Sequence, residues 1–350
     1  MTDTGTAATP VALWRLDLDD YVHAMAVHPD GDNAVVGSLG GEAALVSTDD
    51  GSTTPLARHE MGVLSIAWSA DGTSVAIGGQ DGRVRIYDRA GAAQGVVELS
   101  DWVTGLAWSP AAPVLAIGAG KRLLVTDATG AALHDFDDQR STVTAIAWSA
   151  DGSRVGVSAY GGVGWHDVVG KRAGRRRRFD WKGSLLTLAT SPDGKWACAG
   201  AQDAMVQIWK LWSGKDLTIA GYPSKIERMA FRHDSHWLAL ACLGELSIWD
   251  FSGKGPEGTA PAMASDHDYH IEALAWSPSG RSIATGGGDG RTIVWPAPTR
   301  KGEQLSPIAR LASDSPVSRV GWIDDASLLV GRADGGVVRL DLGPTDPSTT

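Results

Sequence analysis

The chain has 350 residues, of which 43% are hydrophobic and 21% charged. This composition is typical of a globular protein and excludes wholesale disorder. The sequence has no run of eighteen apolar residues, which excludes a membrane-spanning helix. The formal net charge of −10 argues against general binding to nucleic acids or anionic membranes, although it leaves local basic patches open.

The two cysteines and the start of the chain indicate the compartment. Residues 1–10 are polar and lack the basic and apolar regions of a signal peptide. Cys198 and Cys242 lie in apolar, strand-like runs, where buried free thiols are common. We therefore expect a reducing compartment, the cytoplasm.

In chain order, the first predicted element is a strand over residues 12–18, and a repeat follows it. Ala-Trp-Ser occurs at residues 67–69, 107–109, 147–149 and 275–277, and four weaker copies fall into the same register. The eight units are spaced by 40 to 46 residues. Such a period indicates a repeat architecture in which one unit cannot bury its faces alone.

Each unit reads as four short strands. In the second unit these are residues 63–68, 74–78, 83–88 and 95–99, separated by turns rich in Asp and Gly. No stretch of ten or more residues has a convincing helical period. The sequence therefore predicts an all-β, radial array.

One position in every unit, which we call the anchor, has only a small residue. If the first strand of each unit lies nearest a common axis, neighbouring sheets crowd there and only a small side chain fits. The anchors are Ala26, Ala67, Ala107, Ala147, Ala189, Ala230, Ala275 and Gly321.

These units resemble the WD-repeat family of β-propellers over nearly the whole chain. Residues 275–295 are close to the family consensus, and Trp249-Asp250 is a literal Trp-Asp ending. The resemblance implies a hydrogen-bonded tetrad in each unit, and His267, Thr285, Asp289 and Trp295 match it completely. Units three and four lack the turn Asp, so we expect them to depend more on apolar packing and to open more readily.

The count of units predicts eight four-stranded blades, with seven as the alternative because seven is commoner in the family. The last unit, residues 317–342, has only three strands. We expect the strand at residues 12–18 to pair with residues 337–341 and close the ring. The expected organisation is one domain over residues 11–343 with flexible tails at 1–10 and 344–350.

Strand order decides which loops share a face of the ring. The first face has the loops that enter the first strands and the turns between second and third strands; the second face has the other two sets. Exposed aromatic residues at a rim are typical of protein interfaces. The predicted partner-binding residues of the first face are Asp20, Tyr21, Asp101, Trp102, Trp181, Lys182, Lys225 and His270.

Residues 171–182 hold seven Lys or Arg against one Asp, near the second face. This basic patch comprises Lys171, Arg172, Arg175, Arg176, Arg177 and Arg178. It could dock an acidic partner, or it could be a solvated edge that discourages aggregation; we favour the solvated edge.

Catalysis and metal binding have little support in the sequence. Residues 266–270 and 233–236 pair His with Asp, but they fall on opposite faces and neither provides the three or four ligands that a metal normally needs. Nucleophile-elbow and phosphate-loop motifs are absent. We therefore expect no cofactor or metal and no enzymatic activity.

The expected function is that of a monomeric interaction scaffold that binds a protein or peptide. The alternative is a propeller enzyme, or a binder of a small ligand or metal, with a site in the central channel.

Overall fold

The structure is a computed structural model, and it describes residues 7–137, 139–170 and 173–343. Strands β1 to β30 make up the regular structure. In chain order they are β1 (Val11–Asp17), β2 (Val22–Val27), β3 (Asn33–Ser38), β4 (Ala43–Ser47), β5 (Thr53–Pro55), β6 (Val63–Trp68), β7 (Ser74–Gly79), β8 (Arg83–Asp88), β9 (Ala93–Glu98), β10 (Val103–Trp108), β11 (Val114–Ala119), β12 (Arg122–Asp127), β13 (Ala132–Phe136), β14 (Ala145–Trp148), β15 (Arg154–Asp167), β16 (Arg176–Thr190), β17 (Trp196–Ala201), β18 (Val206–Lys210), β19 (Lys215–Ile219), β20 (Arg228–Phe231), β21 (Trp237–Cys242), β22 (Glu245–Asp250), β23 (Ala262–Ser265), β24 (Ile271–Trp276), β25 (Ser282–Gly287), β26 (Arg291–Pro296), β27 (Ala309–Ala312), β28 (Val317–Asp324), β29 (Ser327–Arg332) and β30 (Gly336–Asp341).

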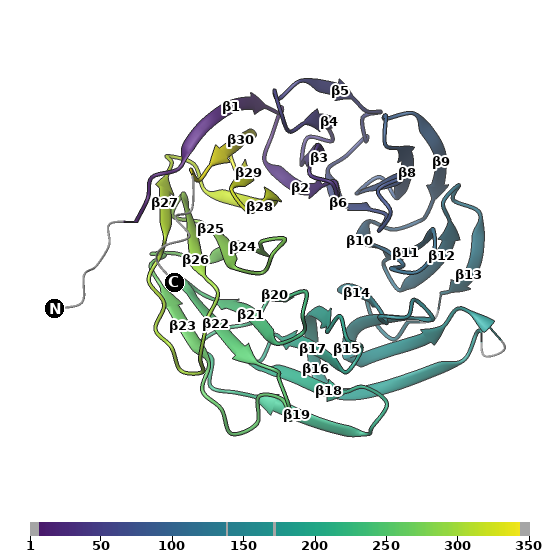
Figure 1. Cartoon of the computed structure of the whole chain (residues 1–350). Coiled ribbons are helices and arrows are strands. Elements are labelled where there is room, and N and C mark those ends of the chain that lie inside the picture. The colour runs from purple at the N-terminus through teal and green to yellow at the C-terminus, as the bar shows by residue number, and fades with distance from the viewer. Residues whose placement is uncertain (1–6, 138, 171–172, 344–350) are drawn as a thin grey trace.

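The strands form a closed ring of antiparallel sheets around a central axis (Figure 1). The first strand of each repeat unit lies innermost and contacts the first strand of the next unit. These inner strands follow one another as β2, β6, β10, β14, β16, β20, β24 and β28, and β28 contacts β2 again. The all-β propeller expected from the repeat is therefore present.

The number of sheets differs from the prediction of eight four-stranded blades. Hydrogen bonding gives seven sheets, six with four strands and one with six, β14 to β19. The fourth and fifth repeat units share the six-stranded sheet, because β16 runs unbroken from the outer strand of one unit into the inner strand of the next. The prediction of eight separate blades is therefore wrong, and seven is the number of separate sheets.

Within this shared sheet, β15 folds back on itself. Gly161 and Gly162 have φ angles of +88° and +126°, a region that only glycine adopts at little cost. Beyond them the Val168 N–H donates to the Ser153 carbonyl at 3.0 Å, and Arg154 pairs with Asp167 at 2.5 Å. The two limbs of β15 thus supply the second and third strands of unit four.

The two ends of the chain meet in one sheet. β1 pairs antiparallel with β30, from Val11 opposite Asp341 to Asp17 opposite Gly336, at the outer edge of the sheet that contains β28 (Figure 1). Residues 1–6 and 344–350 of the two expected tails lie outside the described residues. The N-terminal tail does not reach residue 10, since the Ala8 N–H donates to Ile308 O at 2.9 Å and Pro10 is buried.

Hydrogen bonds from the repeated Trp join neighbouring units at the anchors. In five units the indole N–H of the Trp after the anchor donates to the anchor carbonyl of the preceding unit, at 2.8 to 3.1 Å. A Cβ added to the Gly321 anchor would lie 2.9 Å from Val27, so the inner strands are as crowded as predicted. The donors are Trp68, Trp108, Trp148, Trp276 and Trp322.

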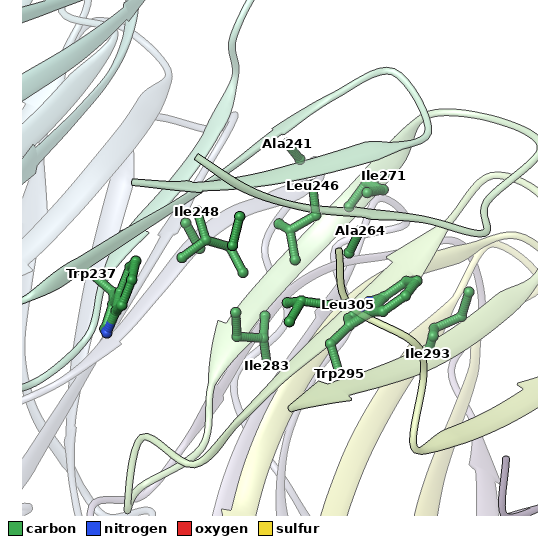
Figure 2. Packing of buried hydrophobic residues seen from close by; sticks show 12 residues of the cluster. Trp237, Ala241, Leu246, Ile248, Ala264, Ile271, Ile283, Ile293, Trp295 and Leu305 are labelled. Carbon is green, nitrogen blue, oxygen red and sulfur yellow. The ribbon is translucent and has the colours of Figure 1, made fainter. Parts of the chain in front are cut away.

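Apolar clusters between adjacent sheets form the core. Figure 2 shows one cluster, in which Trp237, Leu246 and Ile248 of one sheet face Ile283 and Trp295 of the next. Burial of these faces provides the main stabilisation, about 25 cal/mol for each Å² of apolar surface removed from water. Cys198 and Cys242 are free and buried in an equivalent cluster.

Candidate functional site

The first face gathers exposed apolar side chains. Twelve large hydrophobic residues are exposed in the described part of the chain, and six of them lie at this face, five in loops or turns and Tyr160 where β15 folds back on itself. The exposed fractions of Trp102 and Tyr269 are 56% and 66%. The six residues, which we call the apolar rim, are Leu39, Met61, Trp102, Tyr160, Leu243 and Tyr269.

Backbone hydrogen bonds hold loops of the first face in place in five units. The Leu39 N–H donates to Tyr21 O at 3.0 Å, and the Gly288 N–H donates to His270 O at 2.9 Å. The equivalent bond recurs in three further units, from Gln80 to Gly62, from Gln202 to Ser184 and from Ala333 to Pro316. The first face is therefore a set of braced turns, which lowers the entropy cost of binding a partner.

The structure places the predicted partner-binding residues at different depths. Asp20, Asp101, Trp102 and Lys182 are exposed on the first face, whereas Tyr21 is partly buried. Trp181 packs against the apolar cluster of the shared sheet, so only part of its ring is available to a partner.

Lys225 and His270 come together beside the channel. Both line a hollow of about 250 Å³ together with Arg228 and Glu272. Lys225 pairs with Glu227 at 3.0 Å, and Arg228 Nη2 lies 4.0 Å from a Glu272 carboxylate oxygen. Acidic and basic groups thus alternate around this hollow.

The tetrad implied by the family resemblance is a chain of hydrogen bonds inside unit seven. His267 Nδ1 lies 3.1 Å from Asp289 Oδ1, and its Nε2 lies 2.9 Å from Thr285 Oγ1. The Trp295 indole N–H donates to the same Thr285 oxygen at 2.9 Å. Burial lowers the pKa of His267, although Asp289 opposes the shift, so the imidazole is neutral at pH 7. His267 is therefore a structural residue.

Three basic residues on the inner strands β2, β20 and β28, which sequence analysis missed, influence one another electrostatically. Burial, Arg319 and Arg228 together lower the pKa of His23 to about 4. Burial and the charge of Arg228 lower the pKa of Arg319 to about 10. The Arg319 guanidinium donates to Ser318 O at 2.6 Å, and the structure shows no carboxylate paired with it among the described residues.

The repeat alignment contains a signal for the two arginines. Arg228 and Arg319 stand two residues before their anchors, where the other six units have Ala, Ser, Gly or Thr. Their strands, β20 and β28, flank β24 in the ring. His23 lies at a β-bulge of β2, a feature that re-aims a side chain.

The His and Asp residues considered as metal ligands have other partners. Asp266 pairs with Arg310 at 2.5 Å, and Asp268 pairs with Arg291 at 2.6 Å. His236 contacts Asp234 at 3.4 Å. Among the described residues, no group of three or more His, Cys, Asp or Glu side chains is placed to hold a metal ion.

The basic patch is only partly described. Lys171 and Arg172 lie outside the described residues. Arg175, Arg176 and Arg177 are exposed on the second face and on β16. Arg178 donates to Asp180 at 2.7 Å and to Gly161 O at 2.8 Å.

The fold is a β-propeller built from repeat units around a central axis, with the apolar rim on its first face. The family described as "WD domain, G-beta repeat" matches residues 51–88, 176–210 and 262–296. Three segments of the chain thus match the WD-repeat family model.

Curated relatives match about a third of the chain. The small ribosomal subunit protein RACK1 of Drosophila melanogaster is 30% identical over 119 residues, which are 32% of this chain and 37% of the relative. RACK1z of Arabidopsis thaliana, also a small ribosomal subunit protein, is 28% identical over 128 residues, 32% of this chain and 39% of the relative. The chain therefore spans less than half the length of either relative.

Two solved structures have the same fold over nearly the whole chain. The C-terminal WD40 domain of Sif2 has a TM-score of 0.80 at 16% identity and covers 96% of this chain and 99% of that domain. The computationally designed Ika8 protein has a TM-score of 0.76 at 20% identity, covering 96% and 100%. At these identities the likeness concerns the fold alone. No helix in the described part of the chain is long and apolar enough to cross a membrane.

Proposed function

We propose that this protein is a non-catalytic scaffold that binds a protein or peptide partner on its first face. The observation that supports this function best is the apolar rim: half of the large exposed hydrophobic residues in the described part of the chain lie on one face. Exposed apolar patches rimmed by polar groups are typical of protein interfaces. We expect Trp102 and Tyr269 to contribute most, since buried aromatic residues dominate binding energies.

The charged residues beside the apolar rim would determine specificity. Asp20 and Asp101 are acidic and precede β2 and β10, whereas Lys182, Lys225 and His270 are basic and lie in or before β16, β20 and β24. A partner with complementary charges would therefore dock in one orientation. The names of the relatives place them in the small ribosomal subunit, which is consistent with a role inside a larger assembly.

We propose further that the protein works as a monomeric ring in the cytoplasm. Closure of the ring by β1 and β30 needs no second chain, and residues 11–343 would form one domain. Two free, buried cysteines suit a reducing compartment. The alternative, a small-ligand site in the channel, is favoured only by the convergence of His23, Arg228 and Arg319.

The test is purification of bound proteins from the native cell with four versions of the chain. We expect Trp102→Ala and Tyr269→Ala to lose partners that the unaltered protein retains. Leu133→Ala is the matched control, because Leu133 is 49% exposed on the outer strand β13, away from the first face. Retention of every partner by both first-face variants, or equal loss with Leu133→Ala, would contradict the proposal.

A further inference from the structure

A hollow of about 400 Å³ lies between repeat units four and five, where the loops of the second face meet. Arg154, Trp165, Asp167, Trp212 and the run Arg175–Arg177 line it, and we call it the Arg–Trp hollow. It lies on the face opposite the apolar rim, so it is independent of the function proposed above.

The Arg–Trp hollow has an excess of positive charge. Its one carboxylate, Asp167, pairs with Arg154 at 2.5 Å. Arg175 and Arg177 are two residues apart along the chain where β16 begins, so they share a side, whereas Arg176 lies over the Phe136 ring at 5.2 Å. The guanidinium groups of Arg175 and Arg177 are therefore not matched by acidic groups in the lining.

Trp212 adopts a backbone conformation that its side chain disfavours. Its φ angle is +62°, in the left-handed region, where a bulky residue is a genuine outlier. Its ring faces the Arg154 guanidinium at 4.4 Å and that of Arg177 at 5.5 Å. This indole orders two arginines beside the hollow, a role that glycine at the same position could not fill.

Trp165 adds an unused donor. It is 1% exposed, and its Nε1 has no hydrogen-bond partner among the described residues. Its ring meets Trp212 edge-on, with centroids 5.4 Å apart. A buried N–H without a partner is costly, and a shift of this ring toward the hollow would let a bound acceptor satisfy it.

The hydrogen-bond donors that the lining of the Arg–Trp hollow leaves unmatched belong to Arg175, Arg177 and Trp165. A ligand whose polar atoms are acceptor oxygens matches these donors. We propose that the Arg–Trp hollow binds a phosphorylated side chain of a partner polypeptide. Guanidinium groups bind phosphate through paired, charge-assisted hydrogen bonds. A single phosphorylated residue fits better than nucleic acid, because a chain of net charge −10 repels a long polyanion and the site is a local hollow.

The experiment follows the indole N–H signals of the 15 Trp residues by NMR during titration. The probes are the peptide Gly-Gly-pSer-Gly-Gly, its unphosphorylated form and a ten-nucleotide oligothymidylate. We expect the phosphopeptide alone to shift the Trp165 and Trp212 signals saturably; Trp165→Phe and Trp212→Phe assign these signals. Arg177→Ala is expected to weaken binding about tenfold or more.

Arg178→Ala is the matched control for charge. It removes the same charge from β16, but Arg178 bonds to Asp180 and Gly161 and does not line the hollow. Affinity in this variant should stay within about twofold of the unaltered protein. Absence of a saturable shift, equal weakening by Arg178→Ala, or tighter binding of the oligothymidylate would each overturn the proposal.

Discussion

The hydroxyl group of Thr285 hydrogen-bonds to two other members of the tetrad, His267 and Trp295. It is fully buried, and its oxygen lies 2.9 Å from both His267 Nε2 and Trp295 Nε1. Thr285→Val keeps the shape of the side chain, so no cavity forms, and it removes these two bonds together with the 3.3 Å bond that Thr285 Oγ1 donates to Ile293 O. Each buried polar group left without a partner costs about 1–3 kcal/mol.

We therefore expect Thr285→Val to lower the free energy of unfolding by about 2–4 kcal/mol, since partial relaxation reduces the sum. With a urea m-value of about 3 kcal/mol/M for a chain of this size, the unfolding midpoint should fall by roughly 1 M. Urea titration followed by tryptophan fluorescence and by far-UV circular dichroism measures the shift.

Thr126→Val is the control for this substitution. Thr126 is also fully buried, but its hydroxyl has no hydrogen-bond partner among the described residues. Removing it should leave the midpoint unchanged or raise it slightly. Equal midpoints for the two variants would refute the reasoning, because burial of a hydroxyl and not its bonding would then set the stability.

Four further predictions concern the ring and its channel. Deletion of residues 1–20 removes β1 and the Trp14 indole bond to Thr48 O, and should cost at least about 3 kcal/mol in a thermal melt; an unchanged melt would contradict closure. Arg319→Met removes a buried charge next to Arg228 and should raise the melting temperature, whereas a fall would show that the charge is compensated. The imidazole of His23 stays neutral in the folded protein down to about pH 4, whereas in the unfolded chain it is protonated below about pH 6.5. The free energy of unfolding should therefore fall as the pH falls from 6.5 toward 4. His23→Gln should flatten this pH dependence, and an unaltered slope would contradict the lowered pKa of His23. In hydrogen exchange, the backbone amides at the contact between β16 and β20 should exchange before those at the contact between β6 and β10. The reverse order would contradict a stabilising role of the indole hydrogen bonds between units.

The repeat made much of the fold predictable. Small anchors at a 40- to 46-residue period placed the first strands near the axis, and the three-stranded last unit indicated that the N-terminal strand would pair with β30. The shared sheet was not predictable by counting units. It depends on β16 continuing past Gly183 where other units break into a loop, which is a matter of backbone path.

The sites were less predictable because they depend on convergence across the ring. Trp102 could be assigned to an exposed rim from its loop, since loop position fixes its face. Arg228 and Arg319 lie 91 residues apart in sequence, and only the closed ring brings their charges together. Trp165 and Trp212 likewise become a pair only when units four and five pack.

The hydrogen bonds between units alter the prediction of which junction in the ring opens most readily. Units three and four lack the turn Asp, and from sequence we expected them to open more readily, yet Trp108 and Trp148 tie each of them to the preceding unit. At the junction of units five and six, Phe231 replaces that Trp and cannot donate. The described residues show no side-chain bond from β20 back to β16, and the side-chain bond that crosses this junction lies in the loops, where the Asp193 N–H donates to Ser235 Oγ at 2.9 Å. Since adjacent inner strands hold the ring closed, the loss of a bond between units should weaken the ring more than a missing tetrad member inside one unit.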